Sequence, residues 1–236
     1  MNSIDRYSSQ SRQSQCGLTL VEILVALLIS LFLIAGVIQL FIGTKQTYRG
    51  HDALSRIQEN GRFAIDRMAW DIRMAGYINP LVAASAAAPA ITGNDGANND
   101  DSITVQWNDG TAISRAYSLM CNGGGNPPCG AQLPTLALSE QTANRQTLIE
   151  GVQQMQIRYG VCTAGIVNLP YVTAAAVANW NNVCSVRIDL LLVSLDDNLV
   201  TQPQTYFYNG GTTPATDRRF YQAFSTTVAI RNRILR

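Results

Sequence analysis

The sequence predicts an α+β fold in which one long N-terminal transmembrane helix packs on an antiparallel β-sheet domain. Three observations support this fold class. An apolar run begins at Leu18, a helical stripe of apolar residues continues beyond it, and strand-like runs separated by turn signals fill most of the remaining chain. A chain of 236 residues has room for a short leader, one membrane helix and one globular domain.

The apolar run from Leu18 to Ile42 is the strongest feature of the sequence. Every residue from Ile23 to Ile38 is apolar, Ala or Gly, with the exception of Ser30. As a helix the run extends about 37 Å, at roughly 1.5 Å per residue, which is enough to cross a bilayer core of about 30 Å. Polar residues follow the run, without the small-residue cleavage site of a secretory signal. We therefore expect a retained helix that crosses the inner membrane once.

The charges indicate the orientation of this helix and the kind of partner. Arg6 and Arg12 favour a cytoplasmic N-terminus and a periplasmic C-terminal domain, although Lys45 and Arg49 weaken this bias. Lys plus Arg number 17 and Asp plus Glu 16, so the sequence has no basic excess that would indicate a nucleic acid partner. Charged residues make up only 14% of the chain, which fits a surface covered by membrane or protein.

Four downstream cysteines, Cys121, Cys129, Cys162 and Cys184, allow three disulfide connectivities. The sequence does not choose among them, and we expect the local pairing, Cys121–Cys129 with Cys162–Cys184, which closes two short loops. An oxidising periplasm favours disulfides over the alternative of four free thiols. Neither spacing is CxxC and the single His51 lies elsewhere, so we expect no metal site and no cofactor.

Glu22 is the one acidic residue in the apolar run. A buried carboxylate costs a few kcal/mol at the bilayer centre and less near the interface. Glu22 could reach the lipid headgroups, or it could complement the positive end of the helix. A third interpretation is that a cation meets it in an apolar environment, and a new α-amino group at Leu18, released by cleavage, would be such a cation.

The segment Cys16-Gly-Leu-Thr-Leu-Val-Glu22, followed by the apolar run, resembles the cleavage and assembly motif of type IV prepilins and pseudopilins. The resemblance implies that prepilin peptidase cuts between Gly17 and Leu18 and methylates Leu18. It also implies that Glu22 pairs with the N-terminal amine of a neighbouring subunit in a filament. Two departures are Leu in place of the usual Phe or Met after the cut, and a leader that ends Gln-Cys-Gly.

On this basis we divide the chain into four parts. Residues 1–17 form the leader peptide, 18–42 the transmembrane half of the pilin helix, 43–76 its periplasmic amphipathic half, and 77–236 the α+β globular domain.

The amphipathic half has a narrow apolar stripe with steps of three or four residues. Its members are Leu54, Ile57, Gly61, Ile65, Met68, Ile72 and Ala75. Charged residues, Asp71 among them, occupy most of the other faces, and Gly76 followed by Asn79-Pro80 predicts the end of the helix. We expect the stripe to face the downstream domain.

Turn signals and apolar runs divide the remainder into expected strands. The predicted strands are Ser102–Trp107, Ala112–Met120, Thr147–Tyr159, Val186–Leu195 and Phe220–Arg231. Asp109-Gly110 predicts a hairpin between the first two. Leu81–Asp101 is expected to be a linker or loop, and Cys121–Gly130 is too rich in Gly, Pro and Asn to be a strand.

Further segments resemble a family of minor pilins. They are Glu59–Ala64, Asp71–Tyr77, Leu148–Val152 with Arg158–Gly160, and Thr227–Arg233. The resemblance implies a low-abundance subunit that primes type IV pilus assembly near the tip, with other minor pilins and the major pilin as partners. A tip adhesin is a further implied partner. The chain would then move from the inner membrane to the pilus at the cell surface, where pili serve adhesion and twitching motility.

Three alternatives remain. A minor pseudopilin of a type II secretion system shares the N-terminal motif. A membrane-anchored binding module that never polymerises has the same helix. An enzyme is not expected, because the sequence contains no GxSxG, HExxH, P-loop or nucleotide-binding motif.

Overall fold

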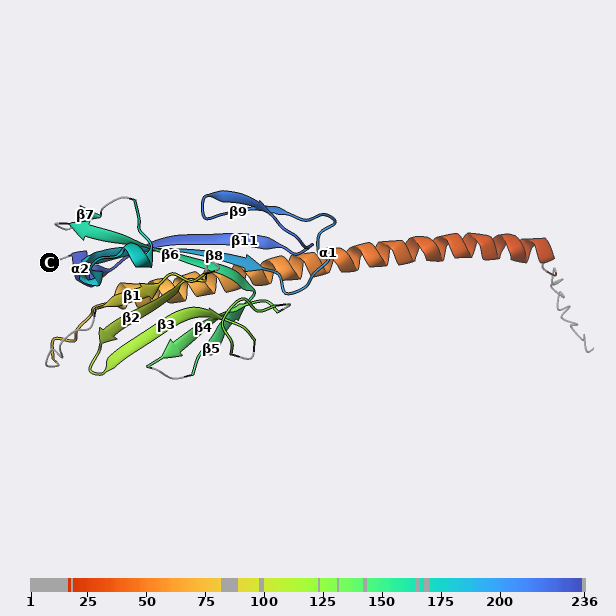
Figure 1. Cartoon of the computed structure of the whole chain (residues 1–236). Helices are drawn as coiled ribbons and strands as arrows, with labels where there is room; N and C mark the ends of the chain where they lie inside the picture. The colour runs from red at the N-terminus through yellow and green to blue at the C-terminus, as the bar shows by residue number, and fades with distance from the viewer. Residues whose placement is uncertain are drawn as a thin grey trace, which may run out of the picture. The chain divides into compact units, whose positions relative to one another are not determined.

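The computed structural model describes residues 17, 19–81, 89–97, 100–122, 124–130, 132–141, 144–163, 166–167 and 170–234. The chain divides into two compact units, Met1–Thr47 and Tyr48–Arg236. The helix α1 (Leu20–Met74) begins in the first unit and ends in the second (Figure 1).

In the first unit, α1 is long and apolar enough to cross a membrane. Its few hydroxyl groups bond to the helix itself. Ser30 donates to the carbonyl of Ala26 at 2.8 Å, and Thr44 donates to the carbonyl of Leu40 at 2.8 Å. A hydroxyl satisfied in this way does not need water, which explains how Ser30 fits an apolar segment.

The second unit combines the C-terminal part of α1 with antiparallel sheets, which confirms the α+β fold class (Figure 1). One sheet has the order β1-β2-β3-β4-β5, another has the order β11-β8-β6-β7, and β9 pairs with β10. The strands are β1 (Ile91–Asn94), β2 (Ser102–Asn108), β3 (Ala112–Met120), β4 (Thr135–Glu140), β5 (Gln146–Glu150), β6 (Val152–Thr163), β7 (Ile166–Val167), β8 (Val183–Val193), β9 (Thr205–Tyr208), β10 (Gly211–Pro214) and β11 (Tyr221–Ala229). Short helices are η1 (Ala174–Ala176), η2 (Trp180–Asn182) and α2 (Arg231–Ile234).

The predicted hairpin at Asp109-Gly110 is confirmed, since Asn108 pairs with Ala112 across the turn and Gly110 has a φ of +99°. Five strands were not expected from the sequence: β1, β4, β7, β9 and β10. β1 lies inside the segment that was predicted as a linker, and β4 had no strong alternation of polar and apolar residues. Both are short and gain their stability from pairing with β2 and β3.

The prediction of one strand over Thr147–Tyr159 is wrong. Gly151 separates β5 from β6, and these two strands belong to different sheets. Gly151 has a φ of +76°, and a Cβ atom there would lie 2.5 Å from the carbonyl oxygen of Val193. The left-handed backbone and the close approach both require glycine, and they redirect the chain from the first sheet to the second.

Helix α1 packs on the second sheet through a face wider than the predicted stripe, because Ala53, Ala64 and Ala69 are buried as well. Its buried residues include Ile57, Gly61, Met68 and Ile72. A Cβ atom on Gly61 would lie 2.3 Å from the ring of Phe224 in β11. Glycine at this position therefore allows the helix to approach the aromatic ring closely.

Asp71 does not lie on a charged outer face, as the sequence suggested, but is fully buried. Its Oδ1 atom accepts a hydrogen bond from Nη1 of Arg115 in β3 at 2.7 Å, and its Oδ2 atom accepts one from the hydroxyl of Tyr117. Nε of Arg115 donates to Glu140 in β4 at 2.8 Å, and the guanidinium lies 5.2 Å from the centre of the Trp107 ring. This network joins the helix to the first sheet, and both oxygens of the buried carboxylate have a donor.

Burial, together with the bond to Asp71, raises the pKa of the Tyr117 phenol. The hydroxyl therefore stays protonated and continues to donate to Asp71 over the whole neutral range.

We expect Asp71→Ala to lower the free energy of unfolding by about 3 kcal/mol or more, because it leaves Arg115 without its buried partner. The measurement is denaturant unfolding of the full chain in detergent, followed by tryptophan fluorescence. Asp66→Ala is the matched control: Asp66 is an exposed acid on the same helix, and its loss should change stability by less than about 0.5 kcal/mol. Equal midpoints for the two variants would contradict the role of Asp71.

Candidate assembly site

The residues around the predicted cleavage point lie at the start of α1. Gly17 is exposed, and Thr19 directly precedes the first helical residue, Leu20. Leu18, the residue expected to be methylated, lies outside the described residues, as does the leader before Gly17. The structure therefore describes Gly17, on the N-terminal side of the predicted cut, and Thr19 with the helix that follows it.

Thr19 caps the helix. Its hydroxyl oxygen accepts a hydrogen bond from the backbone N–H of Glu22 at 3.3 Å, and its carbonyl accepts one from the N–H of Ile23 at 3.2 Å. Thr19 is not among the predicted site residues, although T-x-x-E before an apolar run is a recognised capping signal. The cap fixes where the helix begins, and so places Glu22 in the first turn.

Glu22 is exposed in the single chain, and within the described residues no basic side chain forms an ion pair with it. Its position in the first turn puts the carboxylate at the positive end of the helix. Almost all the side chains that follow it on α1, from Ile23 to Ile29, are large and apolar. Each of these large side chains is at least half exposed in the single chain. An acid in such surroundings can receive a cation from another molecule.

The structure pairs Cys121 with Cys129 and Cys162 with Cys184, which is the local pairing expected from the sequence. The second disulfide joins β6 to β8, two neighbouring strands of the same sheet. The two disulfides therefore constrain two separate parts of the second unit, the loop after β3 and the pair of strands β6 and β8.

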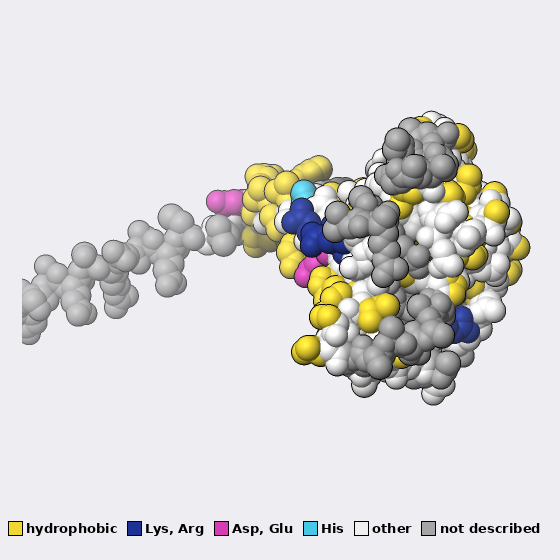
Figure 2. Space-filling view, turned by 90° about the vertical axis from the view of Figure 1, so that its left-hand side faces the viewer, with side chains coloured by type: hydrophobic (Ala, Val, Ile, Leu, Met, Phe, Trp, Pro, Cys, Tyr) yellow, Lys and Arg dark blue, Asp and Glu magenta, His cyan; other side chains and the backbone are white. Residues whose placement is uncertain are grey.

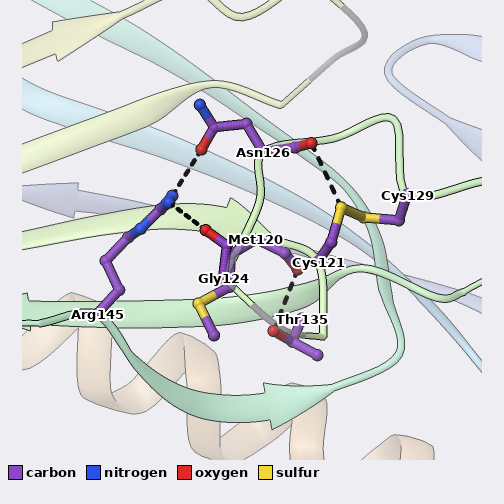
Figure 3. The surroundings of a disulfide bond; sticks show 7 residues. All are labelled: Met120, Cys121, Gly124, Asn126, Cys129, Thr135 and Arg145. Atoms are coloured by element: carbon purple, nitrogen blue, oxygen red, sulfur yellow. Dashed lines mark hydrogen bonds between the residues drawn. A yellow bond between two sulfur atoms is a disulfide. The ribbon is translucent and has the colours of Figure 1, made fainter.

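The disulfide Cys121–Cys129 closes the loop between β3 and β4 (Figure 3). Arg145, which precedes β5, holds the same loop from outside the ring. Its Nη1 atom donates to the side-chain oxygen of Asn126 at 2.7 Å, and its Nη2 atom donates to the carbonyl of Gly124 at 2.9 Å. The described residues of this loop have no regular secondary structure, and one disulfide and one arginine side chain hold them in place.

Comparison with known proteins shows the family of the chain. The family model of the type IV pilus-assembly protein W, PilW, matches residues 105–232, more than half of the chain. The chain belongs to the PilW family. The prokaryotic N-terminal methylation motif matches residues 12–38, a span that includes Gly17, Leu18 and Glu22. A chain of this family with this motif is a type IV pilin-like protein, and its apolar helix is the element that can anchor it in a membrane.

A type IV-like pilin from Thermus thermophilus is a similar solved structure. It shares 12% sequence identity with the chain at a TM-score of 0.43, and the match covers 77% of this chain and 98% of that one. No curated protein matches the chain.

The acidic residues near β1 in this PilW-family chain support backbone structure. Oδ2 of Asp101 accepts a hydrogen bond from the N–H of Ile157 at 2.7 Å, and the two oxygens of Asp95 accept from the first two N–H groups of η1, each at 2.8 Å. Burial raises the pKa of Asp101 above its usual range. No group of His, Cys, Asp or Glu in the described part of the chain is arranged to hold a metal ion.

On the face of the PilW-family domain in Figure 2, charged side chains take up a small part of the surface, and most of the Lys and Arg atoms gather in one patch. This agrees with the low share of charged residues in the sequence, 14%.

We expect removal of the Cys121–Cys129 disulfide, by Cys121→Ser with Cys129→Ser, to lower the free energy of unfolding by about 2.5 kcal/mol. This estimate follows from the loop entropy that the bond removes from the unfolded chain. Removing the longer Cys162–Cys184 loop in the same way should cost about 3.5 kcal/mol. Denaturant unfolding under non-reducing conditions measures both. An unchanged midpoint in the first variant would show that Arg145 is sufficient to hold the loop.

Proposed function

We propose that this protein is a minor pilin that takes part in priming and assembling type IV pili near the tip. Its PilW-family membership and its methylation motif support this role. The observation that carries the proposal is Glu22, an exposed acid without an ion-pair partner among the described residues, in the first turn of an otherwise apolar helix. The family description names the pilus, and this favours a pilus over a secretion pseudopilus.

Processing prepares the helix for assembly. In this proposal prepilin peptidase cuts between Gly17 and Leu18 on the cytoplasmic side of the inner membrane and methylates Leu18. The exposure of Gly17 is compatible with access by the peptidase. Cleavage removes the leader and creates a positively charged amine at Leu18, two residues before α1 begins.

The same helix then changes its surroundings. In the bilayer the apolar side chains of α1 contact lipid, and in a filament they contact neighbouring helices. The exchange costs little hydrophobic free energy, because lipid chains and the surfaces of neighbouring helices are both apolar. Apolar packing alone therefore does not fix the depth at which one subunit sits beside the next.

Glu22 can fix the depth at which one subunit sits beside the next. It is the one charged residue between Leu20 and Ile42. An unpaired carboxylate is costly in apolar surroundings, and this cost is relieved when the amine of a neighbouring subunit lies beside it. The partner at this site would be another minor pilin or the major pilin.

The folded domain would face the periplasm before assembly and the cell surface afterwards. Its two disulfides are typical of an oxidising compartment. At the tip of the pilus the domain would contact other minor pilins and a tip adhesin, and in this way contribute to adhesion and twitching motility.

The test of processing is the intact mass and the N-terminal peptide of the protein in sheared surface pili and in membranes. We expect a chain that begins at N-methyl-Leu18 in the sheared fraction. Gly17→Ala should leave the chain at its full length in the membrane, because the peptidase requires glycine before the cut. Efficient cleavage of that variant would remove the peptidase assignment, and a processed wild-type chain found only in membranes would contradict the pilus role.

We expect Glu22→Ala to be cleaved normally but to enter pili about tenfold less, which corresponds to a loss of about 1.4 kcal/mol in assembly. Quantitative immunoblots of sheared pili against membranes measure this ratio. Glu59→Ala is the control, because Glu59 is an exposed acid of the same helix within the second unit. If both variants enter pili as well as the wild type, Glu22 has no part in assembly.

A further inference from the structure

The strand β5 has an unpaired edge. It is the terminal strand of the sheet β1-β2-β3-β4-β5, and one of its edges pairs with β4. Within the described residues, no strand pairs with the other edge. Such an edge presents a row of free backbone N–H and C=O groups, which many proteins protect with lysine or proline. β5 has the sequence Gln-Thr-Leu-Ile-Glu and contains neither.

A groove of about 510 Å³ runs along β5. Four consecutive residues of the strand, Thr147 to Glu150, line it. Because side chains alternate between the two faces of a sheet, a groove lined by consecutive residues follows the edge of the strand. Its other walls are α1, from Asp52 to Asn60, and the end of β8 with the residues after it, from Leu192 to Asp196.

The groove offers apolar surface at two accessible side chains. Leu148 in β5 is half-buried, and Leu195 is 46% exposed. An extended chain laid along β5 would point every second side chain towards one face of the groove, so it needs apolar residues at alternate positions.

The charges of the groove are mostly negative. Asp52, Glu150 and Asp196 line it together with one basic residue, Arg56. Arg56 pairs with Asp52 at 3.0 Å, and Arg49 pairs with Asp196 at 3.5 Å. Among the described residues, Glu150 at the end of β5 has no ion-pair partner, which favours a basic residue on the occupant.

We propose that β5 receives an extended segment of another protein as an added strand in this groove. The segment carries apolar side chains at alternate positions and a lysine or arginine beside Glu150. Backbone hydrogen bonds to β5 supply most of the affinity, while the leucines and Glu150 select the sequence. This site lies within the second unit and does not depend on how the apolar helix assembles.

The test uses the full chain in detergent and a fluorescent heptapeptide in which valine and threonine alternate around a central lysine. Fluorescence anisotropy measures its binding, and hydrogen exchange with mass spectrometry follows the amides of β5. We expect saturable binding and slower exchange in β5. The same peptide with every backbone nitrogen methylated should not bind, because it retains the side chains but cannot pair as a strand.

Two protein variants test the charge selection. Glu150→Lys should bind the lysine peptide about fivefold more weakly, since an exposed ion pair is replaced by a repulsion. Glu59→Lys makes the same change at an exposed acid outside the groove lining and should bind like the wild type. The proposal is overturned if the peptide does not bind, if the methylated peptide binds equally well, or if the two variants behave alike. None of these outcomes bears on the processing of Gly17 or on the role of Glu22.

Discussion

The buried carboxylate of Asp71 is the interaction on which the second unit depends most directly. A helix can be held against a sheet by apolar contacts alone, and α1 is held to β11 in this way at Gly61. The contact with β3 is different, because Arg115 and Tyr117 must meet Asp71 at fixed distances and directions. Apolar contacts tolerate sliding, whereas this network has one register. It fixes the position of the helix along the first sheet.

The sequence predicted the helix, the hairpin β2–β3 and the fold class well, because each rests on a local pattern. A local pattern does not show which partner a charged residue finds. Asp71 follows the helical spacing of a surface acid, and only the fold brings Arg115 to it from 44 residues away. The break between β5 and β6 was missed for a related reason, since the carbonyl of Val193 that makes Gly151 necessary belongs to β8, which lies far along the sequence.

The assembly site was more accessible to sequence reasoning than the domain. The proposed roles of Gly17 and Glu22 rest on a local pattern, because both residues lie in the segment that matches the N-terminal methylation motif. Thr19 was accessible too, because its capping role follows from T-x-x-E alone. The groove beside β5 could not be predicted from the sequence. Its walls come from α1, β5 and β8, which only the tertiary structure brings together.

The two disulfides also limit the maximum extension of the chain under a pulling force. A subunit held at one end and pulled at the other can lengthen only by the residues outside its covalent rings. The bonds enclose sequence separations of 8 and 22 residues, which shortens the fully stretched chain by about 100 Å at roughly 3.4 Å per residue. The bond between β6 and β8 also stops these strands from separating completely.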